Sequence, residues 1–197
     1  MSETSDRATH QAAIDPDSEF TTLKPADYDE KLREIGNYLW TLEQAADLAS
    51  AHGDQSGVDE AEAKIVAQAQ RAESFLKVAG SHQLLAAFVT GLGNRMARRW
   101  EEATHHFLSV LEINPTNGEA WLELTWCLAE LGKWDECEMA ARKSTEVFPS
   151  ASSSWGNLAM ALNHLGKREE ALQAIHHAIE LDPNDSRNHA IKTEIGV

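Results

Sequence analysis

Features that define several classes of protein are scarce or missing in this chain of 197 residues. It has only two cysteines, too few for a disulfide scaffold, so we expect a reduced, cytoplasmic setting. No apolar run approaches the roughly 20 residues of a membrane-spanning helix. No basic segment leads into an apolar stretch, which is the pattern of a secretory signal. We therefore expect neither insertion into a membrane nor export.

Positive charge is also scarce. Lys and Arg number 17 against 32 Asp and Glu, which gives a formal net charge of −15 at pH 7. A molecule of this charge is repelled by phosphate backbones, so we do not expect nucleic acid as a partner. Apolar residues make up 42% of the chain, which is enough to build a packed core.

Motifs for catalysis are missing as well. We find no Gly-rich phosphate loop, no metalloprotease spacing and no nucleophile elbow, so we expect no enzyme activity and no cofactor. Histidines number nine, and two adjacent pairs lie at 105–106 and 176–177. Neighbours on a helix diverge by about 100°, so a pair cannot chelate one ion. Glu101 and Glu102 could each add one ligand, short of a zinc set, and we expect no metal site.

The first segment, residues 1–24, is acidic and has few large apolar residues. It cannot bury enough surface to offset its ordering entropy, and we interpret it as a disordered tail. A solubilising role is the simpler reading, and a short docking motif around Ile14 or Phe20 is the alternative.

A helical hairpin is predicted over residues 25–80. Apolar or small residues recur every three or four positions along its first helix, at Leu32, Ile35, Leu39, Leu42, Ala46 and Ala49. The segment 52–57 holds two glycines and ends this helix, and Ser56 could cap the next one. Two helices joined by a short loop should pack antiparallel. Pairing of this hairpin between two chains would give a homodimer, although Ala46 and Ala49 weaken such a seam.

The rest of the chain repeats with a period of 34 residues. Prolines recur at Pro115, Pro149 and Pro183, and small residues recur at Ala103, Cys137 and Ala171. The same period relates Trp121 to Trp155, Leu124 to Leu158, Leu128 to Leu162 and Gly132 to Gly166. Aligned together, these positions define three copies at 84–117, 118–151 and 152–185. Such a period is typical of repeat architectures in which stacked units share one core.

This pattern resembles the tetratricopeptide repeat (TPR) family. The resemblance implies an all-α solenoid in which each repeat is two short antiparallel helices, with the small residue allowing close approach. The first copy departs from the pattern, with Ala87, Thr90 and Arg98 at the large, leucine and glycine positions. We expect the hairpin to supply the missing bulk and cap that end. A short polar helix over 186–197, opened by Ser186, should cap the other end, and Thr116 should cap the second repeat.

The resemblance also implies a concave groove lined by the first helix of each repeat. The family's groove positions fall on Leu85, Phe88, Leu92, Met96, Glu119, Leu122, Glu123, Trp126, Glu130, Asn157, Met160 and His164. We expect this surface to hold a protein or peptide partner through apolar anchors, with Trp126 as one of the contacts. The acidic side chains of Glu119, Glu123 and Glu130 favour a partner with flanking Lys or Arg. Occlusion of the first repeat's surface by the hairpin or tail is the alternative.

One TPR subgroup clamps the C-terminal carboxylate of heat-shock chaperones with Lys, Asn and Arg. The matching positions here are Phe88, Leu92, Glu123, Ser153 and Asn157, of which only Asn157 could contribute. The sequence therefore predicts a non-catalytic interaction adaptor without this clamp. Two alternatives stay open. One is a chaperone similar to those of type III secretion translocators, and the other is a scaffold that self-associates through the hairpin.

The two cysteines, Cys127 and Cys137, fall on the two helices of one repeat. Cys137 occupies the small packing position, so we expect buried, inert thiols, with a disulfide or redox switch as the alternative.

Overall fold

The computed structural model describes residues 23–77 and 80–196. Within these ranges all regular structure is helical, which confirms the predicted all-α fold. All of the predicted tail except Leu23 and Lys24 lies outside the described residues. The elements are, in chain order, η1 (Pro25–Asp27), α2 (Tyr28–Ala51), α3 (Gln55–Leu76), η2 (Gly80–His82), α4 (Gln83–Met96), α5 (Trp100–Ile113), α6 (Gly118–Glu130), α7 (Trp134–Val147), α8 (Ser152–His164), α9 (Arg168–Leu181) and α10 (Ser186–Ile195).

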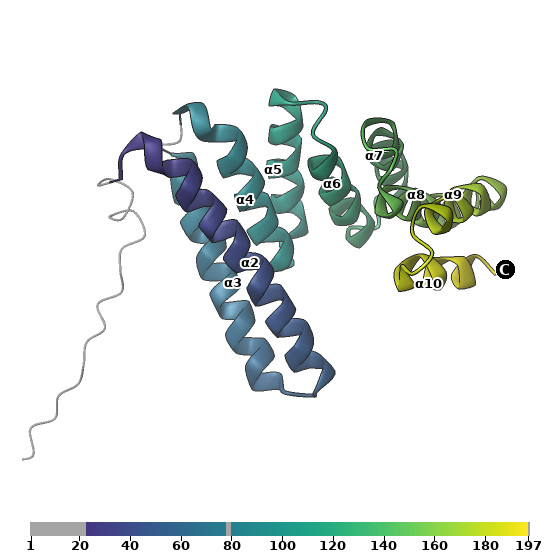
Figure 1. Cartoon of the computed structure of the whole chain (residues 1–197), viewed down its shortest axis with the longest axis horizontal. Helices are drawn as coiled ribbons and strands as arrows, with labels where there is room; N and C mark the ends of the chain where they lie inside the picture. The colour runs from purple at the N-terminus through teal and green to yellow at the C-terminus, as the bar shows by residue number, and fades with distance from the viewer. Residues whose placement is uncertain (1–22, 78–79, 197) are drawn as a thin grey trace, which may run out of the picture.

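The first two long helices form an antiparallel hairpin that reaches well beyond the first repeat (Figure 1). α3 packs against α4 so closely that a Cβ added to Gly93 would lie 2.8 Å from the Cα of Ala69. α2 also contacts α4. The buried Phe75 of α3 belongs to the same core cluster as Ala87, which is small where the other repeats carry tryptophan. The hairpin therefore lies directly on the first repeat.

Three helix pairs follow, α4 with α5, α6 with α7 and α8 with α9 (Figure 1). Gly132 and Gly166 adopt positive φ angles of 68° and 73° in the turns within the second and third pairs. Arg98 adopts φ 57° at the equivalent turn of the first pair, a conformation that disfavours a residue with a Cβ. The repeat geometry is thus kept where the sequence departs from it.

The prolines and tryptophans of the period work together. The Nε1 of Trp121 donates to the carbonyl oxygen of Pro115 at 2.8 Å, and Trp155 donates to that of Pro149 at 2.8 Å. Each indole is thereby fixed against the loop that precedes its own helix.

Helix α10 closes the far end by packing on α8 and α9 (Figure 1). Its apolar residues Ile191 and Ile195 are buried. A Cβ on Gly156 would overlap the side chain of Asn188, so Asn188 would have to move if position 156 carried a larger residue.

The predicted helix caps are wrong by one or two residues. Asp54 caps α3 in place of Ser56, Asn117 caps α6 in place of Thr116, and Asp185 caps α10 in place of Ser186. Asp and Asn are among the strongest N-cap residues, and here each accepts a bond from a backbone N–H of the first turn.

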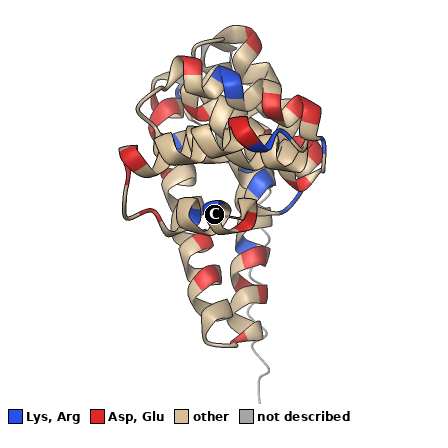
Figure 2. Cartoon of the chain, turned by 90° about the vertical axis from the view of Figure 1, so that its right-hand side faces the viewer, with Lys and Arg blue, Asp and Glu red and all other residues tan. Residues whose placement is uncertain are grey.

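Asp and Glu residues are spread along the helices, and Lys and Arg residues are fewer (Figure 2). No helix in the described part of the chain is long and apolar enough to cross a bilayer.

Candidate functional site

The first helices of the pairs lie next to one another along the stack. α4 contacts α6, α6 contacts α8, and α8 contacts α10. By contrast, α5 and α7 do not pack closely against each other. The inner side of a curved stack brings its helices closer, so α4, α6, α8 and α10 line the concave face. α2 joins this row through its contact with α4.

A buried arginine stands at the centre of this face. The guanidinium of Arg95 is bound by Glu43 of α2, with Nη1 to Oε1 at 2.9 Å and Nη2 to Oε2 at 3.3 Å. Its Nε lies 2.7 Å from Oε2 of Glu123 on α6, an ion pair whose angle is poor for a hydrogen bond. The side chain is 4% exposed. Arg95 therefore ties together three helices that are distant in sequence.

Burial and the neighbouring charges shift the pKa values in this cluster in opposite directions. Burial alone would lower the pKa of Arg95, but the neighbouring carboxylates of Glu123 and Glu43 raise it above its ordinary value. Burial raises the pKa of Glu123, and the charge of Arg95 opposes that rise. A buried charge that lost its partner would be costly, so the cluster is a structural tie as well as part of the face.

Two tryptophans flank the same arginine. The Arg95 guanidinium lies 5.4 Å from the ring centre of Trp40 and 5.2 Å from that of Trp126. Arg187 of α10 lies 4.6 Å from the Trp126 ring and donates to Oδ1 of Asn157 at 2.9 Å. These distances suit cation–π attraction, so the Trp126 ring is held in place before any partner arrives.

Asn157 is the second buried polar group of the face. It is 1% exposed, and its Nδ2 has no hydrogen-bond partner among the described residues. Arg187 has no carboxylate within ion-pair distance in the same part of the chain. Unused donors therefore lie together beside Trp126.

The predicted groove residues fall into three groups. Leu92 and Met96 are buried between the first repeat and the hairpin, and Asn157 is buried between α8 and α10. Half-buried residues are Leu85, Phe88, Leu122, Glu123, Trp126 and Met160, and exposed ones are Glu119, Glu130 and His164. Leu92 and Met96 therefore offer little surface to a partner, because the hairpin covers this part of the first repeat.

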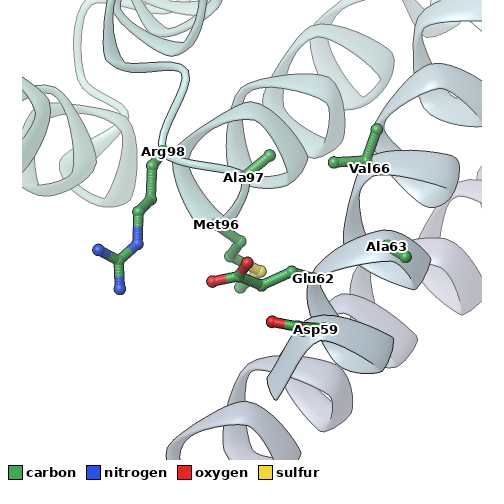
Figure 3. A pocket seen from close by; sticks show the side chains of 7 residues that line it. All are labelled: Asp59, Glu62, Ala63, Val66, Met96, Ala97 and Arg98. Carbon is green, nitrogen blue, oxygen red and sulfur yellow. The ribbon is translucent and has the colours of Figure 1, made fainter. Parts of the chain in front are cut away.

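Met96 lines a pocket between the first half of α3 and the end of α4 (Figure 3). The other residues around it are Asp59, Glu62, Ala63, Val66, Ala97 and Arg98. His164 is also engaged elsewhere, because its ring stacks on Trp134 with centroids 3.7 Å apart. The face is thus centred on Trp126 and does not extend evenly over the predicted residues.

Residues that sequence reasoning missed are Trp40, Glu43, Arg95 and Arg187. The sequence did contain an indication of Arg95, since it is the only charged residue in the mostly apolar helix α4. A lone charge on such a helix needs a buried partner. Nothing in the local sequence indicates that Glu43, 52 residues earlier, is that partner.

The two thiols lie inside the second repeat. Burial raises the pKa of Cys127 and of Cys137 to about 12, and both are fully buried. Among the described residues no three His, Cys, Asp or Glu side chains are arranged to hold a metal ion.

The helix pairs and their concave row define a helical-repeat solenoid. Family models of the tetratricopeptide repeat match residues 152–185 and 106–139. The second match is offset from the 118–151 copy and begins within α5. The chain therefore carries tetratricopeptide repeats over these residues.

Solved structures of low sequence identity share the fold. YrrB, described as a TPR protein with an unusual peptide-binding site, is 21% identical with a TM-score of 0.61, covering 85% of this chain and 88% of its own. The first TPR of Spaghetti (RPAP3), bound to an HSP90 peptide, is 19% identical with a TM-score of 0.55, covering 57% and 89%. The Yersinia enterocolitica type III secretion translocator chaperone SycD is 17% identical with a TM-score of 0.50, covering 57% and 85%. Comparison with the curated proteins gives no significant sequence match.

Proposed function

We propose that this chain is a non-catalytic, cytoplasmic adaptor that holds a peptide segment of another protein on its concave face. The observation that carries the proposal is the fixed Trp126 ring, braced by Arg95 and Arg187 and still partly accessible. An aromatic ring held in place loses little entropy on binding, which is the property of an interface hot spot. Among the similar structures, the first TPR of Spaghetti (RPAP3) is bound to an HSP90 peptide and YrrB has a peptide-binding site, which supports this use of the fold.

The chemistry of the partner follows from which charges remain free. Glu123 is paired with Arg95, so it does not contribute a free negative charge. Glu119 and Glu130 are exposed and have no ion pair within the described residues. We therefore propose a partner segment with an apolar anchor on Trp126 and Leu122, with Lys or Arg beside Glu119 and Glu130, and with an acceptor oxygen for Arg187.

Selection from a random peptide library tests this function. We expect enriched peptides to pair an apolar residue with Lys or Arg, and to bind the Leu122→Glu and Glu119→Lys variants at least about tenfold more weakly. Glu180→Lys, a charge reversal on the exposed side of α9, is the matched control and should bind normally. Equal binding by all variants would move the site away from the concave face.

A further inference from the structure

An apolar groove runs between α5 and α7 on the opposite side of the molecule, with α6 as its floor. We call it the α5–α7 groove, and it is lined by Thr104, Leu108, Trp121, Leu124, Leu128, Glu136, Met139, Ala140 and Lys143. Leu108 and Met139 are 44% and 63% exposed on its two walls. The hydroxyl oxygen of Thr104 is buried there without a hydrogen-bond partner among the described residues. Exposed apolar side chains gathered in a groove are unusual unless they serve binding.

The repeat supplies an internal comparison for this groove. One period later, between α7 and α9, Glu138 replaces Thr104 and Arg142 replaces Leu108. Arg142 is 2.6 Å from Glu170 and 2.8 Å from Glu138, and Lys167 is 2.6 Å from Glu138. This set of ion pairs, which we call the clasp, spans α7 and α9 with polar groups.

The start of α7 carries the residues that would form the other half of a clasp at the α5–α7 groove. Lys133 and Glu136 stand one period before Lys167 and Glu170. Neither Lys133 nor Glu136 has an ion pair within the described part of the chain. The α5–α7 groove is therefore apolar because α5 carries Thr104 and Leu108 where α7 carries Glu138 and Arg142.

The rim of the α5–α7 groove is acidic. Glu136 lines it, while Glu101 and Glu112 continue the helical row of Thr104 and Leu108 by steps of three and four residues. None of these three carboxylates has an ion pair among the residues described. Lys143, the basic residue of the lining, is bound to Glu146 at 2.6 Å, so the three carboxylates outnumber the one cation, Lys133, that has no ion pair within the described ranges. A positively charged partner is the one that suits this rim.

We propose that the α5–α7 groove is a second docking surface and that it takes an amphipathic helix of another protein. The apolar stripe of that helix packs between Leu108 and Met139, and its Lys or Arg residues lie against Glu101, Glu112 and Glu136. A groove between two helices can accommodate a third helix. Its floor consists of Trp121, Leu124 and Leu128, whose i, i+3, i+7 spacing forms an apolar stripe along α6. The exposed, adaptable Met139 suits such a contact.

Charge argues against the two occupants that this chain could itself supply. Residues 1–22 carry five carboxylates, at Glu3, Asp6, Asp15, Asp17 and Glu19, against Arg7. A second copy of the chain brings a net charge of −15. Both would repel the acidic rim.

Methionine methyl groups report separately on the two faces. Met139 lies in the α5–α7 groove, Met160 is half-buried on the concave helix α8, and Met96 is buried at the hairpin. In the full chain labelled with methyl-¹³C methionine, we titrate a synthetic helical peptide of Leu and Lys with its leucines on one stripe. A peptide with Glu in place of Lys is the matched probe.

We expect the Leu/Lys peptide to shift the Met139 signal saturably and the Leu/Glu peptide to bind at least about tenfold more weakly. The Thr104→Glu, Leu108→Arg variant should build a clasp with Lys133 and Glu136 and lose the shift. The reciprocal variant, Glu138→Thr with Arg142→Leu, keeps the α5–α7 groove and should retain it. Circular dichroism and thermal unfolding confirm that both variants fold.

Several results would overturn the second surface. One is equal binding by the clasp-building variant, and another is a response of Met160 alone. A third is a Met139 signal that depends on protein concentration without peptide, which would make a second copy the occupant. The Leu122→Glu variant separates this inference from the proposed function, because it should weaken concave binding and leave the Met139 response unchanged.

Discussion

The concave and outer faces of this solenoid treat their side chains in opposite ways. On the concave face, the charge of Arg95 is satisfied by Glu43 and Glu123 from two other helices. On the outer face, Leu108 and Met139 remain exposed although the same position one repeat later is closed by ion pairs. The repeat thus determines the backbone of both faces, while single residues determine which surface is covered by ion pairs and which leaves apolar side chains exposed.

Removing the concave tie should produce the largest effect. Arg95→Met leaves Glu43 and the half-buried Glu123 without their cation, and breaking such a pair costs about 3–5 kcal/mol of unfolding free energy. Urea unfolding monitored by circular dichroism measures it. Arg142→Met in the more exposed clasp is the matched control and should cost about 1 kcal/mol or less. Equal losses would remove the contrast between the two faces.

The junction of hairpin and first repeat should come next. Gly93→Ala places a Cβ 2.8 Å from the backbone of Ala69, so α3 and α4 must separate, at about 1–3 kcal/mol. Gly36→Ala is its control, because that Cβ would meet Val89 at an ordinary 3.7 Å. Removing helical glycine there should stabilise by about 0.4–1 kcal/mol. A stable Gly93→Ala protein would show that the hairpin does not pack tightly.

The clasp should make a smaller, pH-dependent contribution. The hydrogen bond from Lys167, together with Arg142, lowers the pKa of Glu138 below its ordinary 4.5. Its contribution is therefore fully present above pH 4.5 and is lost as pH falls through the lower folded value. Glu138→Gln should flatten the loss of stability on the acid side, as measured by urea unfolding across pH. An unchanged acid limb would contradict the ion pairing.

The two cysteines in the interior between the faces should show the smallest effect, because a thiol reagent should not react with the folded protein. With pKa values of about 12 and full burial, Cys127 and Cys137 have almost no thiolate at pH 8. Ellman's reagent should modify neither thiol in the native state and both in denaturant. Rapid native labelling would indicate that the second repeat opens readily.

Much of the fold could be predicted because its signals are local and repeated. The prolines, the small residues and Trp121 with Trp155 recur in phase, and the structure uses each pair in the same way. The cap residues were misplaced by one or two positions because Ser, Thr, Asp and Asn compete within each loop, and propensity alone does not choose among them.

The candidate site was predictable only in outline. The row containing Trp126 follows from the family's pattern, whereas its brace does not. Arg95 meets Glu43 only because the hairpin folds back on α4, and Arg187 reaches Trp126 only because α10 closes the stack. Leu92 and Met96 lose their exposure for the same reason. Such long-range contacts have no periodic signature in the sequence.

Titration of methyl-¹³C methionine protein with a library-selected peptide tests the concave assignment most directly. Met160 lies on α8 in the row beside Trp126, and Met139 lies on the outer face. We predict a saturable shift of Met160 that disappears in Leu122→Glu while Met139 stays unchanged. Tight binding with an unmoved Met160 in the wild-type protein would contradict the account, because the partner would then be held away from the concave face.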